Sequence, residues 1–141
     1  MPENNVAEAL EEYGGRELGD VKILMVEDDR FFTKLVLNKL SENGCIPYST
    51  GQGDEAMKLA SQYQPNLIIL DLMLPGMSGE DILRTLKAND QLKDIPVVIF
   101  SNKSNQVDID NNLQLGAAEF LVKSTTDLAD LIEVVKRLAK K

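Results

Sequence analysis

Five short apolar segments, each followed by a longer amphipathic stretch, constrain this 141-residue chain more than any other feature of its sequence. The apolar segments are residues 21–26, 46–49, 67–70, 97–100 and 120–122. Short apolar runs that alternate with helical patterns are typical of βαβ units, which build a parallel sheet with helices packed on it. The sequence therefore predicts one α/β domain with five parallel strands.

The stretches between and after these segments predict five helices. The first carries a stripe of Leu35, Leu37 and Leu40. Turn and cap residues predict where these helices begin and end. The first helix ends at Gly44, the second ends at Pro65 and the third begins at Ser78. The fourth spans about 104–115 and the last about 127–140. Residues 1–20 hold six acids against one arginine. They are predicted to form an acidic arm or linker, with a short helix favoured over 6–13, and 21–141 to form the domain.

A chemically reactive side chain follows four of the five apolar segments. These residues are Glu27, Asp28 and Asp29 after the first, Asp71 after the third, Ser101 after the fourth and Lys123 after the fifth. Ligands of open parallel sheets bind outside the carboxyl ends of the strands, where the strand order reverses. Carboxylates gathered there repel one another unless a cation lies among them, and oxygen ligands favour a hard ion. The pattern therefore predicts a Mg²⁺ site at this edge.

Each of these residues also has a purely structural explanation. Acids after a strand often cap the following helix, and Asp71 would suit an ordinary turn. Ser101 would suit a helix cap, and Lys123 alone would be a solvated charge. Their joint occurrence favours a site, especially because lysine cannot cap a helix N-terminus by accepting a hydrogen bond.

Composition excludes several kinds of chemistry. The chain has no histidine and one cysteine, Cys45, so Ser-His-Asp and Cys-His nucleophiles, internal disulfides, zinc clusters and most transition-metal sites are excluded. A formal net charge of −8 argues against nucleic acid as a direct partner and favours a protein partner. Apolar runs are too short to span a bilayer, and residues 1–20 lack the pattern of a secretory signal, so a cytoplasmic location is expected.

Two segments resemble the response-regulator receiver family. Residues 22–29, Lys-Ile-Leu-Met-Val-Glu-Asp-Asp, look like its first strand and acidic pair, and residues 67–79, Leu-Ile-Ile-Leu-Asp-Leu-Met-Leu-Pro-Gly-Met-Ser-Gly, look like its phosphoacceptor strand and loop. The intervals of 43, 30 and 22 residues that separate Asp28, Asp71, Ser101 and Lys123 are those of a receiver without insertions. The resemblance covers about residues 20–141 and implies a flavodoxin-like (βα)5 doubly wound sheet with strand order 2-1-3-4-5.

The resemblance also implies how the site would work. Asp71 would accept a phosphoryl group from a phosphohistidine on a partner histidine kinase or phosphotransfer protein. Mg²⁺ would be held by Asp28, Asp71 and the backbone carbonyl of Met73, with Glu27 acting through a water molecule. Lys123 would pair with phosphoryl oxygens. The chain would assist its own phosphorylation and dephosphorylation rather than act as an enzyme on other substrates.

A switch is implied as well. Ser101 would hydrogen-bond the phosphoryl group, and Phe120 would turn inward. Together they would alter the face made by the fourth helix, the fifth strand and the fifth helix, to which a downstream protein target would bind. No DNA-binding segment follows Lys141 in this sequence, so we expect output through another protein or through a longer chain, with the domain a monomer or a weak dimer through the same face.

Some positions depart from the commonest family pattern. Ser124 stands where a proline in a cis peptide is usual, which predicts a loop of different shape or greater mobility. Asn102 replaces a frequent alanine, and Phe120 lacks the hydroxyl group of the common tyrosine. Met73 and Lys103 flank the site where the rate of phosphate loss is often tuned. These differences bear on phosphate lifetime and output geometry.

Three other functions are compatible with parts of the pattern. A Mg²⁺-dependent phosphatase with an aspartate nucleophile would need a second acid two residues after the nucleophile, but Met73 stands at that position. A flavin or nucleotide binder would want a glycine-rich phosphate loop after the first strand, where the acids would repel an anion. A degenerate receiver that only scaffolds partners stays open, although all five site residues are present.

Overall fold

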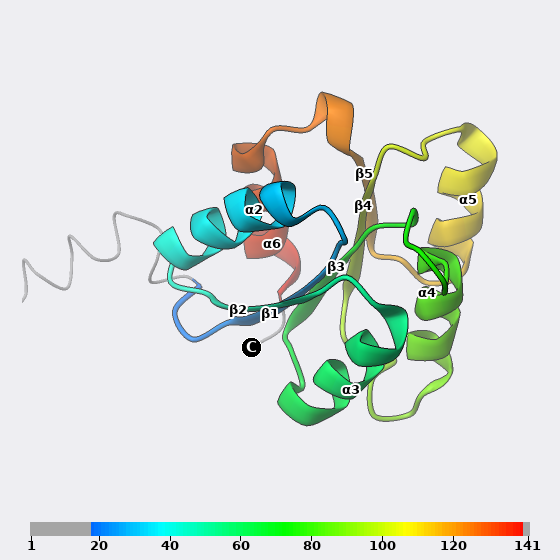
Figure 1. Ribbon diagram of the computed structural model, residues 1–141, viewed down its shortest axis with the longest axis horizontal. Helices are drawn as coiled ribbons and strands as arrows, with labels where there is room; N and C mark the ends of the chain where they lie inside the picture. Colours follow the sequence, from blue (N-terminus) through cyan, green and yellow to red (C-terminus); the bar gives the residue numbers. More distant parts are fainter. Residues whose placement is uncertain (1–17, 140–141) are drawn as a thin grey trace, which may run out of the picture.

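The apolar segments form a five-stranded parallel sheet in the computed structural model, which describes residues 18–139 (Figure 1). The strands are β1 (Lys22–Val26), β2 (Ile46–Thr50), β3 (Leu67–Leu70), β4 (Val97–Ser101) and β5 (Glu119–Val122). Their order across the sheet is β2-β1-β3-β4-β5, and every neighbouring pair is parallel. The predicted α/β class and strand order 2-1-3-4-5 are confirmed.

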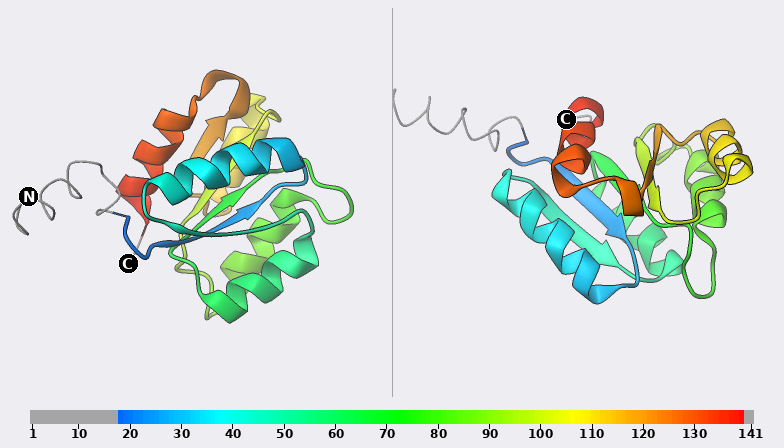
Figure 2. Two further views of the ribbon diagram at one scale, coloured as in Figure 1. Left: turned by 60° about the vertical axis from the view of Figure 1, so that its left-hand side comes forward. Right: turned by 90° about the horizontal axis from the view of Figure 1, so that it is seen from above.

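Helices cover both faces of this sheet (Figure 2). They are α2 (Arg30–Glu42), α3 (Gly53–Tyr63), α4 (Gly79–Ala88), α5 (Gln106–Gln114), the single 3-10 turn η1 (Lys123–Thr125) and α6 (Leu128–Leu138). α2 and α6 pack on one face, and α3, α4 and α5 lie on the other. Each helix within residues 18–139 falls short of the length and apolarity that a membrane span requires. The predicted helix over 6–13 lies outside the described residues. The last helix ends at Leu138, two residues before its predicted end at about 140, because the backbone of Ala139 is extended.

Side-chain alternation explains why the strands are apolar on both sides. In β1, Ile23 and Met25 pack into the core under α2 and α6, whereas Leu24 and Val26 pack into the core under α3 and α4. Successive residues of a strand point to opposite faces, so a strand covered on both faces needs a continuous apolar run. This leaves the carboxyl ends of the strands as the place where polar side chains converge.

Most helix ends follow the predicted signals. Gly44, after α2, has the positive φ of 91° expected of a glycine that terminates a helix, and Gln64 leaves the helical region directly before Pro65, with φ of 48°. Ser78 caps α4 by accepting a hydrogen bond from the Asp81 N–H (3.1 Å). The Asp81 carboxylate lies beside Arg84, one turn further along the helix (3.8 Å).

The N-terminus of α4 packs so closely on the end of β3 that residue 79 must be glycine. A Cβ atom at Gly79 would lie 2.2 Å from the carbonyl oxygen of Asp71 and 2.5 Å from the Cα of Leu72. Glycine at this position therefore allows the first turn of α4 to lie against the backbone that carries Asp71.

We predict that Gly79→Ala lowers the free energy of unfolding by about 2 kcal/mol or more, because the backbone at Asp71 must move. Gly76→Ala is the matched control. A Cβ at Gly76 has no atom within 4 Å, so only the positive φ of 77° costs stability, by about 1 kcal/mol. Urea denaturation of both variants measures the difference, and equal losses would contradict the steric argument.

Candidate functional site

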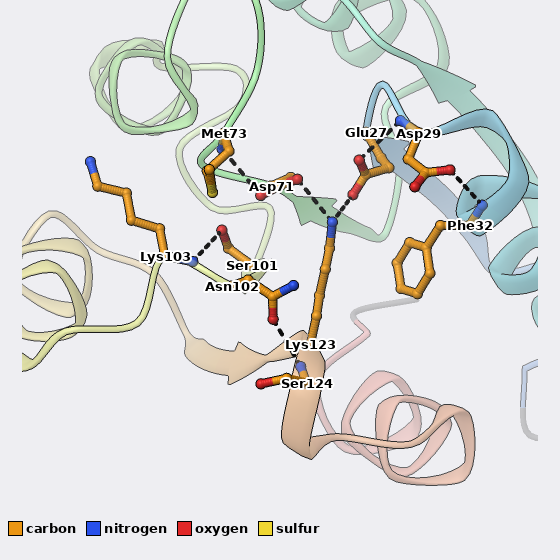
Figure 3. Close-up of polar contacts among 10 residues, drawn as sticks. All are labelled: Glu27, Asp29, Phe32, Asp71, Met73, Ser101, Asn102, Lys103, Lys123 and Ser124. Carbon is orange, nitrogen blue, oxygen red and sulfur yellow. Dashed lines mark hydrogen bonds and ion pairs between the residues drawn. The ribbon is translucent and has the colours of Figure 1, made fainter.

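The strand ends bring the predicted residues to one edge of the sheet (Figure 3). Glu27 follows β1, Asp71 follows β3, Ser101 ends β4 and Lys123 follows β5. Glu27, Asp28 and Asp71 each offer a carboxylate oxygen within 4.8 Å of the others. The convergence expected from a parallel sheet is therefore present in the structure.

The ammonium group of Lys123 lies between two buried carboxylates. Its Nζ donates to Oε2 of Glu27 in a short contact and to Oδ2 of Asp71 at 2.9 Å. The side chains of Glu27 and Asp71 are 2% and 7% exposed, and that of Lys123 is 15% exposed. Buried carboxylates are stable only when paired in this way, so Lys123 is part of the site and not a solvated charge.

The three consecutive acids after β1 have different environments. Asp29 caps α2, because its Oδ1 accepts from the Phe32 N–H (3.0 Å). Glu27 points inward, and its Oε1 accepts from the Asp29 N–H (3.1 Å). Asp28 is exposed and, with Glu27, lines a cleft of about 630 Å³ between α2 and the loop after β2. The capping explanation therefore holds for Asp29 alone.

Burial and ion pairing act in opposite directions on the pKa values of this cluster. Burial would raise the pKa of Asp71, but hydrogen bonds from Lys123, Ser101 and the Met73 N–H hold it below its usual range. Glu27 has a raised pKa because burial outweighs the effect of Lys123. Burial would lower the pKa of Lys123, yet its two carboxylate partners raise it. Asp71 is thus held ionised and Lys123 protonated.

The donor set fits a hard divalent cation. When ionised, Glu27, Asp28 and Asp71 carry three negative charges against one positive charge on Lys123, which leaves the cluster at −2. The three acids offer oxygen ligands, and Asp28 is open to the cleft, which Arg30 and Lys34 also line. Carboxylate oxygens with room for water are what Mg²⁺ prefers. The assignment of individual ligands, including the Met73 carbonyl, stays a prediction.

The residues predicted to bind the phosphoryl group or respond to it lie beside this cluster. Ser101 is fully buried, and its Oγ accepts from the Lys103 N–H (3.2 Å). The Met73 N–H donates to Oδ1 of Asp71 (3.1 Å), while the Met73 side chain is exposed. Phe120 is partly buried against the core under α3 and α4. Their roles in a switch stay predictions.

A family model confirms the resemblance seen in the sequence. The model of the response regulator receiver domain matches residues 23–136, most of the chain. The chain belongs to the response-regulator receiver family.

Known relatives place this receiver among response regulators. The DNA-binding response regulator MtrA of Mycobacterium tuberculosis (strain H37Rv) is 33% identical over 102 residues, which cover 72% of this chain and 43% of MtrA. The phosphate regulon transcriptional regulatory protein PhoB of Escherichia coli (strain K12) is 34% identical over 118 residues, which cover 82% and 52%. The receiver therefore spans about half the length of these curated relatives.

Solved structures show the same fold. The BeF3-activated N-terminal receiver domain of RstA from Klebsiella pneumoniae superposes with a TM-score of 0.78 at 27% identity, covering 85% of this chain and 99% of that one. The Mn²⁺-bound form of the response regulator Rcp1 gives a TM-score of 0.70 at 34% identity, covering 82% and 89%.

Asn102 and Ser124, two residues that depart from the family pattern beside the site, contact each other. The Ser124 N–H donates to Oδ1 of Asn102 (2.9 Å), tying the loop after β5 to the loop after β4 (Figure 3). Proline at position 124 would have no N–H, and alanine at 102 no acceptor. The peptide bonds of residues 18–139 include no cis bond, and Ser124 lies within η1. The loop therefore lacks the cis peptide of the family pattern and is tied by this hydrogen bond.

We predict that Lys123→Met makes stability depend strongly on pH. Without the ammonium group, burial and mutual repulsion raise the pKa of Glu27 and Asp71 above the values of the unfolded chain. The native state then binds protons more readily, so stability is present at low pH and is lost as the pH rises through the raised pKa values. In metal-free buffer the variant should gain about 1–2 kcal/mol of unfolding free energy between pH 7 and pH 5 relative to the wild type.

Lys93→Met is the control, because Lys93 is half exposed in a surface ion pair with Asp90. Urea denaturation at both pH values should show no such gain for this variant. A Lys123→Met protein with the pH dependence of the wild type would contradict the pairing.

A double-mutant cycle tests the bond between Asn102 and Ser124. We predict that Asn102→Ala and Ser124→Pro each change the free energy of unfolding, and that Asn102→Ala has no further effect once Ser124→Pro is present. The coupling should be about 0.5–1 kcal/mol, since the bond is exposed. Ser124→Ala keeps the N–H and should retain the full effect of Asn102→Ala. Additive losses in the cycle would contradict the bond.

Proposed function

We propose that this receiver is the phosphoacceptor switch of a two-component phosphorelay, phosphorylated on Asp71 in a Mg²⁺-dependent reaction. The supporting observation is that Asp71 is buried yet held ionised by Lys123 at a strand edge that carries two further acids. A carboxylate kept anionic beside a cation is a ready nucleophile for phosphorus. The family resemblance implies a phosphohistidine on a partner histidine kinase or phosphotransfer protein as the donor, and this chain has no histidine of its own that could serve.

The transfer forms a bond between a carboxylate oxygen of Asp71 and phosphorus and breaks the phosphorus–nitrogen bond of the donor. The donor imidazole keeps the electron pair and takes a proton from solvent. Water later attacks phosphorus, releases inorganic phosphate and restores the carboxylate. The chain thus undergoes and assists its own phosphorylation and dephosphorylation and does not act as an enzyme on other substrates.

The neighbouring groups orient and neutralise the phosphoryl oxygens. The Lys123 ammonium, now shared between Glu27 and Asp71, pairs with one oxygen, and the Ser101 hydroxyl binds another. Asp28, Asp71 and the backbone carbonyl of Met73 would hold Mg²⁺, with Glu27 acting through a water molecule, and the bound ion would supply positive charge against the phosphoryl oxygens.

An apolar surface beside this edge supports a protein as the phosphoryl donor. Phe31, in the first turn of α2, is 74% exposed, and Leu35 lies one turn further along and is 43% exposed. Exposed large apolar side chains grouped beside a reactive site are typical of a contact for a protein partner.

Signalling would follow from the changed charge at Asp71. Movement of Ser101 and Phe120 would alter the face formed by α5, β5 and α6, where a downstream protein binds and where a weak dimer could form. We place the reaction in the cytoplasm, with no direct contact to nucleic acid by this domain. A scaffold that works without phosphorylation is the second candidate, and the experiment below separates the two.

Intact-mass measurement after incubation with acetyl phosphate tests the proposal. We expect one added phosphoryl group in the presence of Mg²⁺, little without it, and none for Asp71→Asn. Asp29→Asn is the matched control, because Asp29 caps α2 outside the cluster and its loss should leave the adduct in place. A wild-type protein that gains no phosphoryl group under rapid quenching would favour the scaffold.

A further inference from the structure

The ring of Phe32 faces the Lys123 ammonium group from the first turn of α2. Nζ of Lys123 lies 4.8 Å from the centroid of the ring (Figure 3). A cation within about 6 Å of an aromatic face is attracted by the negative potential of that face, and the attraction is stronger where water is excluded. The Lys123 side chain is only 15% exposed, so this contact is largely shielded from solvent.

The ring is itself fixed in place. Phe32 packs against Phe100, which is 1% exposed, with ring centroids 5.5 Å apart and planes tilted by 43°. Tilted aromatic pairs at this separation are favourable beyond the area they bury. Phe100 precedes Ser101 in β4, so Phe32 rests on the strand that supplies the phosphoryl-binding hydroxyl group.

A closed cycle of contacts runs through Phe32. The Phe32 N–H donates to Asp29, the Asp29 N–H donates to Glu27, and Glu27 accepts from Lys123, whose ammonium group lies over the Phe32 ring. Each member of the cycle is therefore held by two others. A lysine side chain has four flexible bonds, and fixing its end costs conformational entropy. Because the cycle already fixes the end of the Lys123 side chain, part of this entropy is lost before any ligand binds.

We propose that Phe32 is a positioning residue for Lys123. Its ring, 4.8 Å from Nζ, limits the positions that the ammonium group can take beside Glu27 and Asp71. Lys123 would thereby be held ready for the phosphoryl oxygens. This inference rests on the proposed phosphoacceptor function of Asp71. The inference adds Phe32 to the residues of the site. The Phe32 side chain has no hydrogen-bonding group, so it acts only through Lys123.

Kinetics of phosphorylation by acetyl phosphate with Mg²⁺ test the role. Phe32→Leu and Phe32→Met keep an apolar side chain but lose the π face, and we expect each to lower the rate constant about fivefold. Phe32→Tyr keeps the π face and should stay within about twofold of the wild type. Urea denaturation selects the folded variants for comparison. A Leu or Met variant that is phosphorylated as fast as the wild type would overturn the proposal.

A spectroscopic signature tests the contact without any phosphorylation. Protons at Cε of Lys123 should be shifted upfield by the Phe32 ring current in the wild type and in Phe32→Tyr, and not in Phe32→Leu or Phe32→Met. Equal Lys123 resonances in all four proteins would overturn the contact. If the wild type takes up no phosphoryl group, the proposed function fails, whereas this NMR comparison still decides whether the ring holds Lys123.

Discussion

The rest of the structure depends on one ammonium group, that of Lys123, placed between the buried carboxylates of Glu27 and Asp71. Glu27 follows β1, Asp71 follows β3 and Lys123 follows β5, so the two ion pairs tie together strand ends from across the sheet. A buried carboxylate that stays ionised without a partner costs several kcal/mol, a large part of a small domain's stability, unless it takes up a proton. The strands can therefore end in acids at this edge only because β5 ends in a cation. Asp28 adds a further negative charge that Lys123 does not balance, and this excess makes the edge attractive to a metal ion.

The same arrangement explains why a conformational switch at this site would require only a small change in free energy. A phosphoryl group on Asp71 adds negative charge where Lys123 is already shared between two acids, so the ammonium group is drawn toward the new oxygens. If Ser101 turned to the phosphoryl group, it could give up the hydrogen bond that its Oγ accepts from the Lys103 N–H, which is worth about 1 kcal/mol. The two proposed arrangements would then differ by few interactions of modest strength. A small difference between states is what allows a local charge to shift their populations.

The sequence predicted the architecture well because its strongest signals are local. Apolar runs give strands, and the residue that follows each run must lie at the carboxyl edge, so the meeting of Asp71 and Lys123 followed from the parallel topology alone. Pairwise contacts between distant positions could not be predicted in this way. The ring of Phe32 meets Lys123 across 91 positions. Asn102 and Ser124 were noted as separate departures from the family pattern, and nothing in either residue alone indicates that one accepts a hydrogen bond from the other.

Helix α5 has Asn112 as its only fully buried residue, whereas α2, α3, α4 and α6 each bury apolar side chains. Asn112 is fully buried on its inner face, and neither Asn112 Oδ1 nor Asp108 Oδ2 finds a hydrogen-bond partner among residues 18–139. Val107 and Leu113 face outward and are 67% and 43% exposed. Buried polar groups without hydrogen-bond partners each lower the stability by about 1–3 kcal/mol. Apolar side chains that face solvent add little stability, because little of their surface is buried. α5 is thus held less firmly than α4, whose inner face buries two leucines and an isoleucine. Among the α-helices of residues 18–139, the one that follows Ser101 in the chain is therefore the one with the least buried apolar surface of its own to hold it in place.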